Sequence, residues 1–97
     1  TGTYSLSYKA DVSENGVLYA YIYYFDANGA AAAMPYTRLN CACHGEVKGK
    51  KCTAEFTVPA DAVQISVNFV LESKDGTQAI ATLDDVKLYC EKDKQII

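Results

Sequence analysis

The 97-residue sequence has no tryptophan, a single histidine and no long apolar run. Its two longest stretches without a charged residue are 15–25 and 27–37, and the second is interrupted by Pro35. A membrane-spanning helix needs roughly 20 consecutive apolar residues, so both stretches are too short. The sequence therefore predicts no membrane insertion.

A basic face is also lacking. The formal net charge is −3, and the lysines and arginines are scattered apart from Lys48, Lys50 and Lys51. We interpret these three lysines as a solvated loop. Nucleic acids and anionic membranes bind basic surfaces, so nucleic acid is not expected as a partner.

The common catalytic motifs are missing as well. The chain contains no Gly-x-Ser-x-Gly and no phosphate-binding loop. A Cys–His nucleophile would have to combine Cys43 or Cys52 with His44, and neighbouring loop residues rarely provide that geometry. Paired carboxylates across a cleft have no support in the sequence. We therefore predict that the protein is not an enzyme.

Cysteine, in contrast, is frequent for a chain of this size. In a small acidic β-type domain, cysteines are disulfide candidates in an oxidising compartment, and four cysteines allow three pairings. A zinc site is the alternative, although Cys-x-Cys-His followed by a distant cysteine differs from the common Cys-x2-Cys knuckle. Free thiols are a third outcome. The disulfide candidates are Cys41, Cys43, Cys52 and Cys90, and the zinc alternative replaces Cys90 by His44.

The dominant pattern is alternation of period two, which is typical of half-buried strands. In 17–25, Leu18, Ile22 and Tyr24 fall on the core face, which leaves Tyr19, Tyr21 and Tyr23 facing outward. Turns with Asn-Gly or Asp-Gly separate the strands. The expected strands are 3–12, 17–25, 36–39, 52–58, 62–72, 77–83 and 86–90, with a loop over 30–35. This pattern predicts an all-β, antiparallel sandwich or barrel occupying 1–90 as one domain, followed by a tail or linker at 91–97.

Several short motifs carry a resemblance to a known family. They are FTVPADA at 56–62, Gly76 and ATLDDVKL at 81–88, together with YSLSYKA at 4–10 and YFDANG at 24–29. These segments resemble the later strands of jelly-roll carbohydrate-binding modules of the galactose-binding-like superfamily. Such modules have about eight strands, so the resemblance implies a jelly roll that lacks its first strands. Cys52 stands where the family often has tryptophan.

The resemblance implies that the first, second and 62–72 strands share one sheet. The outward tyrosines would then lie beside Ser5, Ser7 and Lys9 and beside the amides of 62–72. Tyrosine rings pack on the C–H faces of sugars, while hydroxyls, amides and an arginine fork hydrogen-bond the sugar hydroxyls. The expected ligand-binding residues are Tyr19, Tyr21, Tyr23, Arg38, Gln64 and Asn68. Alternatively, the tyrosines only stabilise the sheet through cross-strand pairs.

In the same family an aspartate at the position of Asp84 often ligates a structural Ca²⁺. Calcium takes roughly six to eight oxygen ligands, and the segment that would supply several of them is missing from the pattern, so a bend capped by one carboxylate is favoured. No other cofactor is expected.

The expected function is a non-catalytic carbohydrate-binding module of an extracellular or cell-surface protein. Because the chain starts at Thr1 without an initiator Met and enters a strand-like pattern at once, we expect it to belong to a larger multidomain chain. The alternative is a structural or protein-interaction module of a cell-surface protein, and a third reading is a small metal-binding domain.

Overall fold

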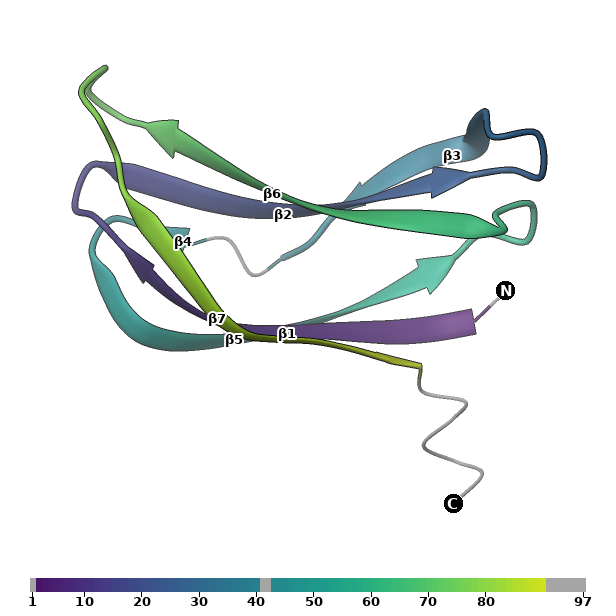
Figure 1. Ribbon diagram of the computed structural model, residues 1–97, viewed down its shortest axis with the longest axis horizontal. Helices are drawn as coiled ribbons and strands as arrows, with labels where there is room; N and C mark the ends of the chain where they lie inside the picture. Colours follow the sequence, from purple (N-terminus) through teal and green to yellow (C-terminus); the bar gives the residue numbers. More distant parts are fainter. Residues whose placement is uncertain (1, 41–42, 91–97) are drawn as a thin grey trace.

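The computed structural model describes residues 2–40 and 43–90, and in this part the protein is all β, with two antiparallel sheets packed face to face (Figure 1). The described residues contain no helix, and therefore none that could cross a membrane. Cys41 and the expected tail at 91–97 lie outside the described residues. The strands are β1 (Gly2–Val12), β2 (Gly16–Phe25), β3 (Ala31–Arg38), β4 (Cys43–His44), β5 (Val47–Val58), β6 (Gln64–Ser73) and β7 (Ala81–Cys90). The antiparallel sandwich predicted from the sequence is confirmed.

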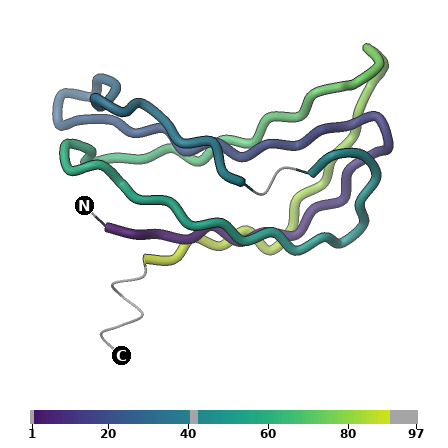
Figure 2. Tube along the Cα trace, turned by 180° about the vertical axis from the view of Figure 1, so that it is seen from behind, coloured from purple at the N-terminus to yellow at the C-terminus, as the bar shows by residue number. Residues whose placement is uncertain are grey.

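One sheet has the strand order β5-β1-β7, and the other is built around β2. Strand β6 pairs with β2 along its whole length, from Gly16 to Phe25. Because one edge of β2 is thus occupied, β3 and β4 share the other edge, with β4 opposite Val17 and Leu18 and β3 opposite the far end of β2. The two layers and the course of the chain between them are visible in Figure 2.

The turn at 13–16 takes the chain from one sheet to the other. The Gly16 amide donates to the Ser13 carbonyl oxygen at 2.9 Å, as in a hairpin, yet β1 and β2 belong to different sheets. A Cβ atom on Gly16 would lie 2.8 Å from Val12 Cγ1, so the glycine lets the backbone pass close to the preceding strand. The expectation that the first two strands share a sheet is therefore wrong.

The core lies between the sheets, on the faces that the alternation predicts. Tyr8, Ile22 and Tyr24 have no exposed surface, and Leu6 and Leu18 are nearly as buried. Burial of this kind stabilises a large aliphatic side chain by about 1.5–3 kcal/mol. The alternating pattern thus assigned the inward residues of β2 correctly.

The sandwich is less well covered where its edge strands β6 and β7 face each other. Leu71 of β6 and Leu83 and Leu88 of β7 are on inward-facing positions of their strands, yet they are 37%, 37% and 44% exposed. A cavity of ≈ 290 Å³ opens here between the sheets, lined among others by Ile65 and Leu88. These inward-facing side chains are only partly covered by the described residues.

Two strands are longer than predicted. The alanines of 30–35 were expected in a loop, but β3 already begins at Ala31. Pairing with β2 overrides the helix preference of alanine, and Pro35 is tolerated because β3 is an edge strand whose register shifts near this point. Strand β5 begins at Val47 rather than Cys52, so the lysines expected in a loop lie on a strand of the β1 sheet.

The end of the expected strand 77–83 and the expected strand 86–90 are joined in one continuous strand, β7, whereas 77–80 are not in a strand. Asp85 adopts a positive φ of 56°, and the β1–β7 register shifts between Ser7 and Lys9. An irregularity of this kind allows a strand to continue past an extra residue. The bend expected at Asp84 is thus a local irregularity inside a strand.

Candidate functional site

The outer face of the β2 sheet carries the expected tyrosines. Tyr19 and Tyr21 are half-buried and Tyr23 is 36% exposed, whereas Tyr24, the next residue along the strand, has no exposed surface. The alternation of β2 is the reason, since neighbouring residues of a strand point to opposite faces. The predicted division of this segment into inward and outward rings is therefore correct.

Strands β3 and β4 add side chains to the same face. Tyr36 lies opposite Tyr23 and Arg38 lies opposite Tyr21 in the β2–β3 register. The guanidinium carbon of Arg38 is 5.2 Å from the ring centre of Tyr19, within the range of a cation–π contact. On the other side, the His44 ring meets the Tyr19 ring edge-on with their centres 6.2 Å apart. We call the set Tyr19, Tyr21, Tyr23, Tyr36, Arg38 and His44 the tyrosine face.

The rings of the tyrosine face form one continuous cluster. The ring centres of Tyr19 and Tyr21 are 6.3 Å apart, and those of Tyr21 and Tyr23 are 6.2 Å apart and nearly parallel at 22°. Tyr36 contacts both Tyr21 and Tyr23, at 5.9 and 5.7 Å. All these separations lie in the range of favourable aromatic pairs. The face is thus an aromatic surface formed by two adjacent strands.

Strand β6 places polar side chains along the other flank of β2. Asn68 lies opposite Tyr21, Ser66 opposite Tyr23 and Gln64 opposite Phe25. The Asn68 amide nitrogen donates to the Ser66 carbonyl oxygen at 3.2 Å and to its hydroxyl at 3.0 Å. This pairing fixes the orientation of the amide. The Asn68 carbonyl oxygen is then left as an acceptor beside the rings.

The phenol groups of the outward rings differ from that of the core tyrosine. The Tyr24 hydroxyl hydrogen-bonds the Thr37 hydroxyl at 2.8 Å. Among the described residues, the hydroxyls of Tyr19, Tyr21, Tyr23 and Tyr36 have no hydrogen-bond partner. Four hydroxyls on one face can therefore each donate to and accept from a ligand.

The structure brings together most of the predicted site and changes its surroundings. The outward tyrosines, Arg38 and Asn68 meet on one face, with Gln64 at its end. Ser5, Ser7 and Lys9 lie in β1, in the other sheet, so they are not neighbours of these rings. The expected serine and lysine flank was wrong because the chain changes sheets at Gly16.

Sequence reasoning missed two members of the tyrosine face. Tyr36 and Arg38 are two positions apart, so on a strand their side chains must point to the same side. That relation could have added Tyr36 to the site. His44 was read as a loop residue, and no pattern in the two-residue strand β4 would have placed it against Tyr19.

The described residues hold no group of three or more His, Cys, Asp or Glu side chains able to bind a metal ion. Asp84 Oδ1 accepts a hydrogen bond from the Asp85 amide at 2.8 Å. No disulfide bond is present among Cys43, Cys52 and Cys90. The fourth cysteine of the predicted framework, Cys41, lies outside the described residues.

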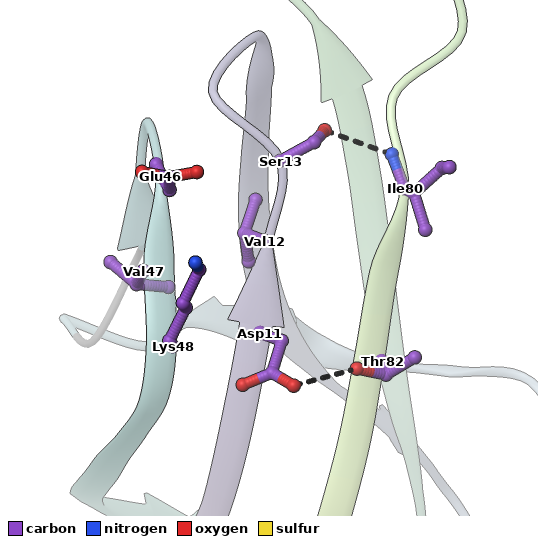
Figure 3. Close-up of a pocket in the computed structure, with 8 residues that line it drawn as sticks. All are labelled: Asp11, Val12, Ser13, Glu46, Val47, Lys48, Ile80 and Thr82. Atoms are coloured by element: carbon purple, nitrogen blue, oxygen red, sulfur yellow. Dashed lines mark hydrogen bonds between the residues drawn. The ribbon is translucent and has the colours of Figure 1, made fainter.

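A cavity of ≈ 330 Å³ opens on the β1 sheet, away from the tyrosine face (Figure 3). Three of the polar side chains that line it, Asp11, Ser13 and Thr82, are engaged within the protein. Asp11 accepts hydrogen bonds from the Gly49 amide and from the Thr82 hydroxyl, and the Ser13 hydroxyl oxygen accepts one from the Ile80 amide. These contacts join β1 to β5 and to the β7 side of the sheet. We therefore interpret the cavity as part of the framework.

Asp75 is the centre of another framework cluster. Its carboxylate accepts hydrogen bonds from the Thr77 hydroxyl at 2.7 Å, the Thr77 amide at 3.0 Å, and the side chains of Asn15 and Ser73. The Thr77 hydroxyl, followed by the Thr77 amide and the other donors, holds the pKa of this carboxyl well below its usual range. The cluster ties the β1–β2 turn to the segment between β6 and β7.

Comparisons with protein-family models, with curated proteins and with solved structures found no significant match for this chain. The class of protein is thus defined by its own features: a β-sandwich with an aromatic face on one sheet.

Proposed function

We propose that the protein is a non-catalytic carbohydrate-binding module and that the tyrosine face is its binding surface. The observation that carries the proposal is the continuous cluster of four outward tyrosine rings whose hydroxyls have no partner among the described residues. Four hydroxyls on one face are thus available as donors and acceptors for a ligand.

The chemistry of the face suits a sugar. A pyranose ring has apolar C–H faces that pack on aromatic rings and a rim of hydroxyls that need donors and acceptors. The rings of Tyr21, Tyr23 and Tyr36 supply the aromatic surface on which the C–H faces can pack. The phenol hydroxyls, Arg38 and Asn68 supply the donors and acceptors for the sugar hydroxyls. Arg38 is already positioned over Tyr19, so little side-chain entropy is lost when its fork binds a ligand.

The wider setting of this function follows from where polymeric glycans occur. We propose that the module acts outside the cell or at the cell surface and holds a larger multidomain chain near its glycan. The half-exposed inward side chains of β6 and β7, such as Leu71 and Leu88, support attachment to further protein. The jelly-roll family of the sequence resemblance fits the same role.

The alternative is a structural or protein-interaction module of a cell-surface protein. It is favoured by the contacts of the rings with one another, since Tyr19 and Tyr21 are half-buried by their neighbours. In this reading the cross-strand pairs only stabilise the sheet.

Affinity gel electrophoresis against a panel of soluble polysaccharides, together with a glycan array, tests the proposal. We expect the wild-type protein to be retarded by at least one polysaccharide, and Tyr21→Ala to lose that retardation at an unchanged circular dichroism spectrum. Tyr89→Ala is the matched control, because Tyr89 is a 39% exposed tyrosine that lies opposite Ser5 in the other sheet. No retardation by any polysaccharide, or equal loss in both variants, would refute the proposal.

A further inference from the structure

Two cysteines from different sheets meet in the core. Cys43 lies in β4 opposite Leu18, and Cys52 lies in β5 opposite Tyr8. Both are buried, at 0% and 4% exposure, and their Sγ atoms are 3.6 Å apart. We propose that Cys43 and Cys52 are a redox-sensitive pair that forms a disulfide between the two sheets. This inference does not depend on the proposed binding function.

The geometry requires only a small movement. A disulfide has an S–S distance of about 2.05 Å, so the two sulfur atoms must approach by roughly 1.5 Å. Strand β4 has two residues and lies at a sheet edge. Gly45, in the connection to β5, and Gly49, near the start of β5, have positive φ values of 77° and 61°, a backbone conformation that other residues rarely adopt. Strand β4 pairs with β2 only at Val17 and Leu18, so a shift of this size disturbs a short stretch of the sheet.

The step is a thiol–disulfide exchange with a low-molecular-weight disulfide as the oxidant. One cysteine loses its proton, and its thiolate attacks a sulfur of the oxidant and releases one thiol. The second cysteine then attacks the mixed disulfide and releases the other thiol. Two protein thiols are thus oxidised by two electrons, and the oxidant is reduced to two thiols.

Burial has a consequence for the rate of this reaction. A disulfide reagent cannot reach sulfur atoms that are 0% and 4% exposed, so the folded protein must first open locally near β4. We therefore expect slow oxidation of the folded protein and faster oxidation when mild denaturant populates the open state.

The bond would attach β4 to β5 covalently. His44 follows Cys43 directly and touches Tyr19, so the same bond would hold the edge of the tyrosine face in place. In addition, closing the short chain segment between the two cysteines restricts the unfolded state. From the entropy of closing a loop of this length and the size of the domain, we expect the midpoint of thermal unfolding, Tm, to rise by about 10–20 °C.

The test uses the purified full chain incubated with oxidised glutathione and compared with the dithiothreitol-reduced protein. Alkylation under denaturing conditions counts the remaining thiols, and tryptic digestion without reductant locates the bond. Cleavage after Lys48, Lys50 and Lys51 separates the two cysteines, but Cys41 and Cys43 share the peptide 39–48. The Cys41→Ala variant therefore makes the assignment unambiguous.

We expect a crosslink between peptide 39–48 and the Cys52 peptide in both wild-type protein and Cys41→Ala, with the rise in Tm on oxidation. Cys43→Ala and Cys52→Ala should each lose the crosslink and the rise, whereas the control Cys90→Ala should keep both. A bond to Cys41 or Cys90, or two alkylatable thiols at positions 43 and 52 after oxidation in mild denaturant, would overturn the proposal. Because the thiol count is made on the wild-type protein, the result does not depend on whether a variant folds. Glycan binding by the reduced protein is a separate measurement, so the two proposals can fail independently.

Discussion

The division of β2 into inward and outward tyrosines can be tested by removing single hydroxyl groups. Tyr24 has no exposed surface, and its hydroxyl lies 2.8 Å from the Thr37 hydroxyl. Tyr24→Phe removes this hydrogen bond and leaves the half-buried Thr37 hydroxyl without its partner. Because a typical intramolecular hydrogen bond contributes about 0.5–1.5 kcal/mol and an unsatisfied polar group adds a penalty, we expect a loss of about 1–2 kcal/mol. For a domain of this size that lowers Tm by roughly 5–15 °C.

Tyr21→Phe is the matched control, since it removes a hydroxyl from a neighbouring outward ring. That hydroxyl has no partner among the described residues, so Tm should stay within about 2 °C of the wild type. Glycan retardation should weaken instead. The assay is thermal unfolding followed by circular dichroism, with urea unfolding as a second measure.

A double-mutant cycle then isolates the hydrogen bond. Thr37→Val alone should destabilise the protein by a similar amount, and the double variant with Tyr24→Phe should lose less than the sum of the two single changes. Additive losses would show that the two hydroxyls do not interact. A larger effect of Tyr21→Phe than of Tyr24→Phe would refute the assignment of the two faces.

Three further changes test the framework. Ile22→Ala should cost about 2–5 kcal/mol in urea unfolding because the side chain has no exposed surface; a cost below about 1 kcal/mol would contradict its place in the core. Gly16→Ala should cost about 1–3 kcal/mol, since the new Cβ would lie 2.8 Å from Val12 Cγ1, and an unchanged urea midpoint would argue against this close approach. Asp75 has a lowered pKa, so its stabilisation is present above the unfolded value of about 3.9 and is lost as the pH falls through the folded value. The difference in Tm between wild type and Asp75→Asn should therefore shrink from pH 6 to pH 2, and a constant difference would contradict the lowered pKa.

The strands that face the core on one side were predictable from the sequence. In β1 and β2, apolar residues alternate with polar or amphipathic ones, and most of the buried residues of each strand lie on one face. Period two identifies such strands because a slip by one residue would expose the whole apolar set. The inward position of Tyr24 followed from Leu18 and Ile22 for the same reason.

Strands that form because they pair with a neighbouring strand were harder to predict. The alanines of β3 have no alternation, and their helix preference is overruled by pairing with β2. At β7, the two aspartates suggested an interruption, but the positive φ of Asp85 lets the strand continue. The residues adjacent in the sequence do not indicate either the pairing of β3 or the continuation of β7.

The candidate site was predictable as a set of outward residues but not as a surface. The sequence determines which side of β2 the tyrosines take, whereas the neighbours of β2 depend on the sheet topology. A turn with the sequence Ser-Glu-Asn-Gly favours a hairpin, and the same turn can connect two layers when Gly16 allows close packing against Val12. Pattern alone does not distinguish the two cases.

This single topological difference changes the chemistry expected of the face. With β1 in the other sheet, the row of tyrosines is flanked by β3 and β6 rather than by serines and a lysine of β1. Tyr36 and Arg38 take the place of those hydroxyls and extend the stacking surface across two strands. Recognition on such a face would depend on ring packing, with hydrogen bonds from phenols and one guanidinium. A ligand with a broad apolar face therefore fits it better than one recognised mainly through its charges.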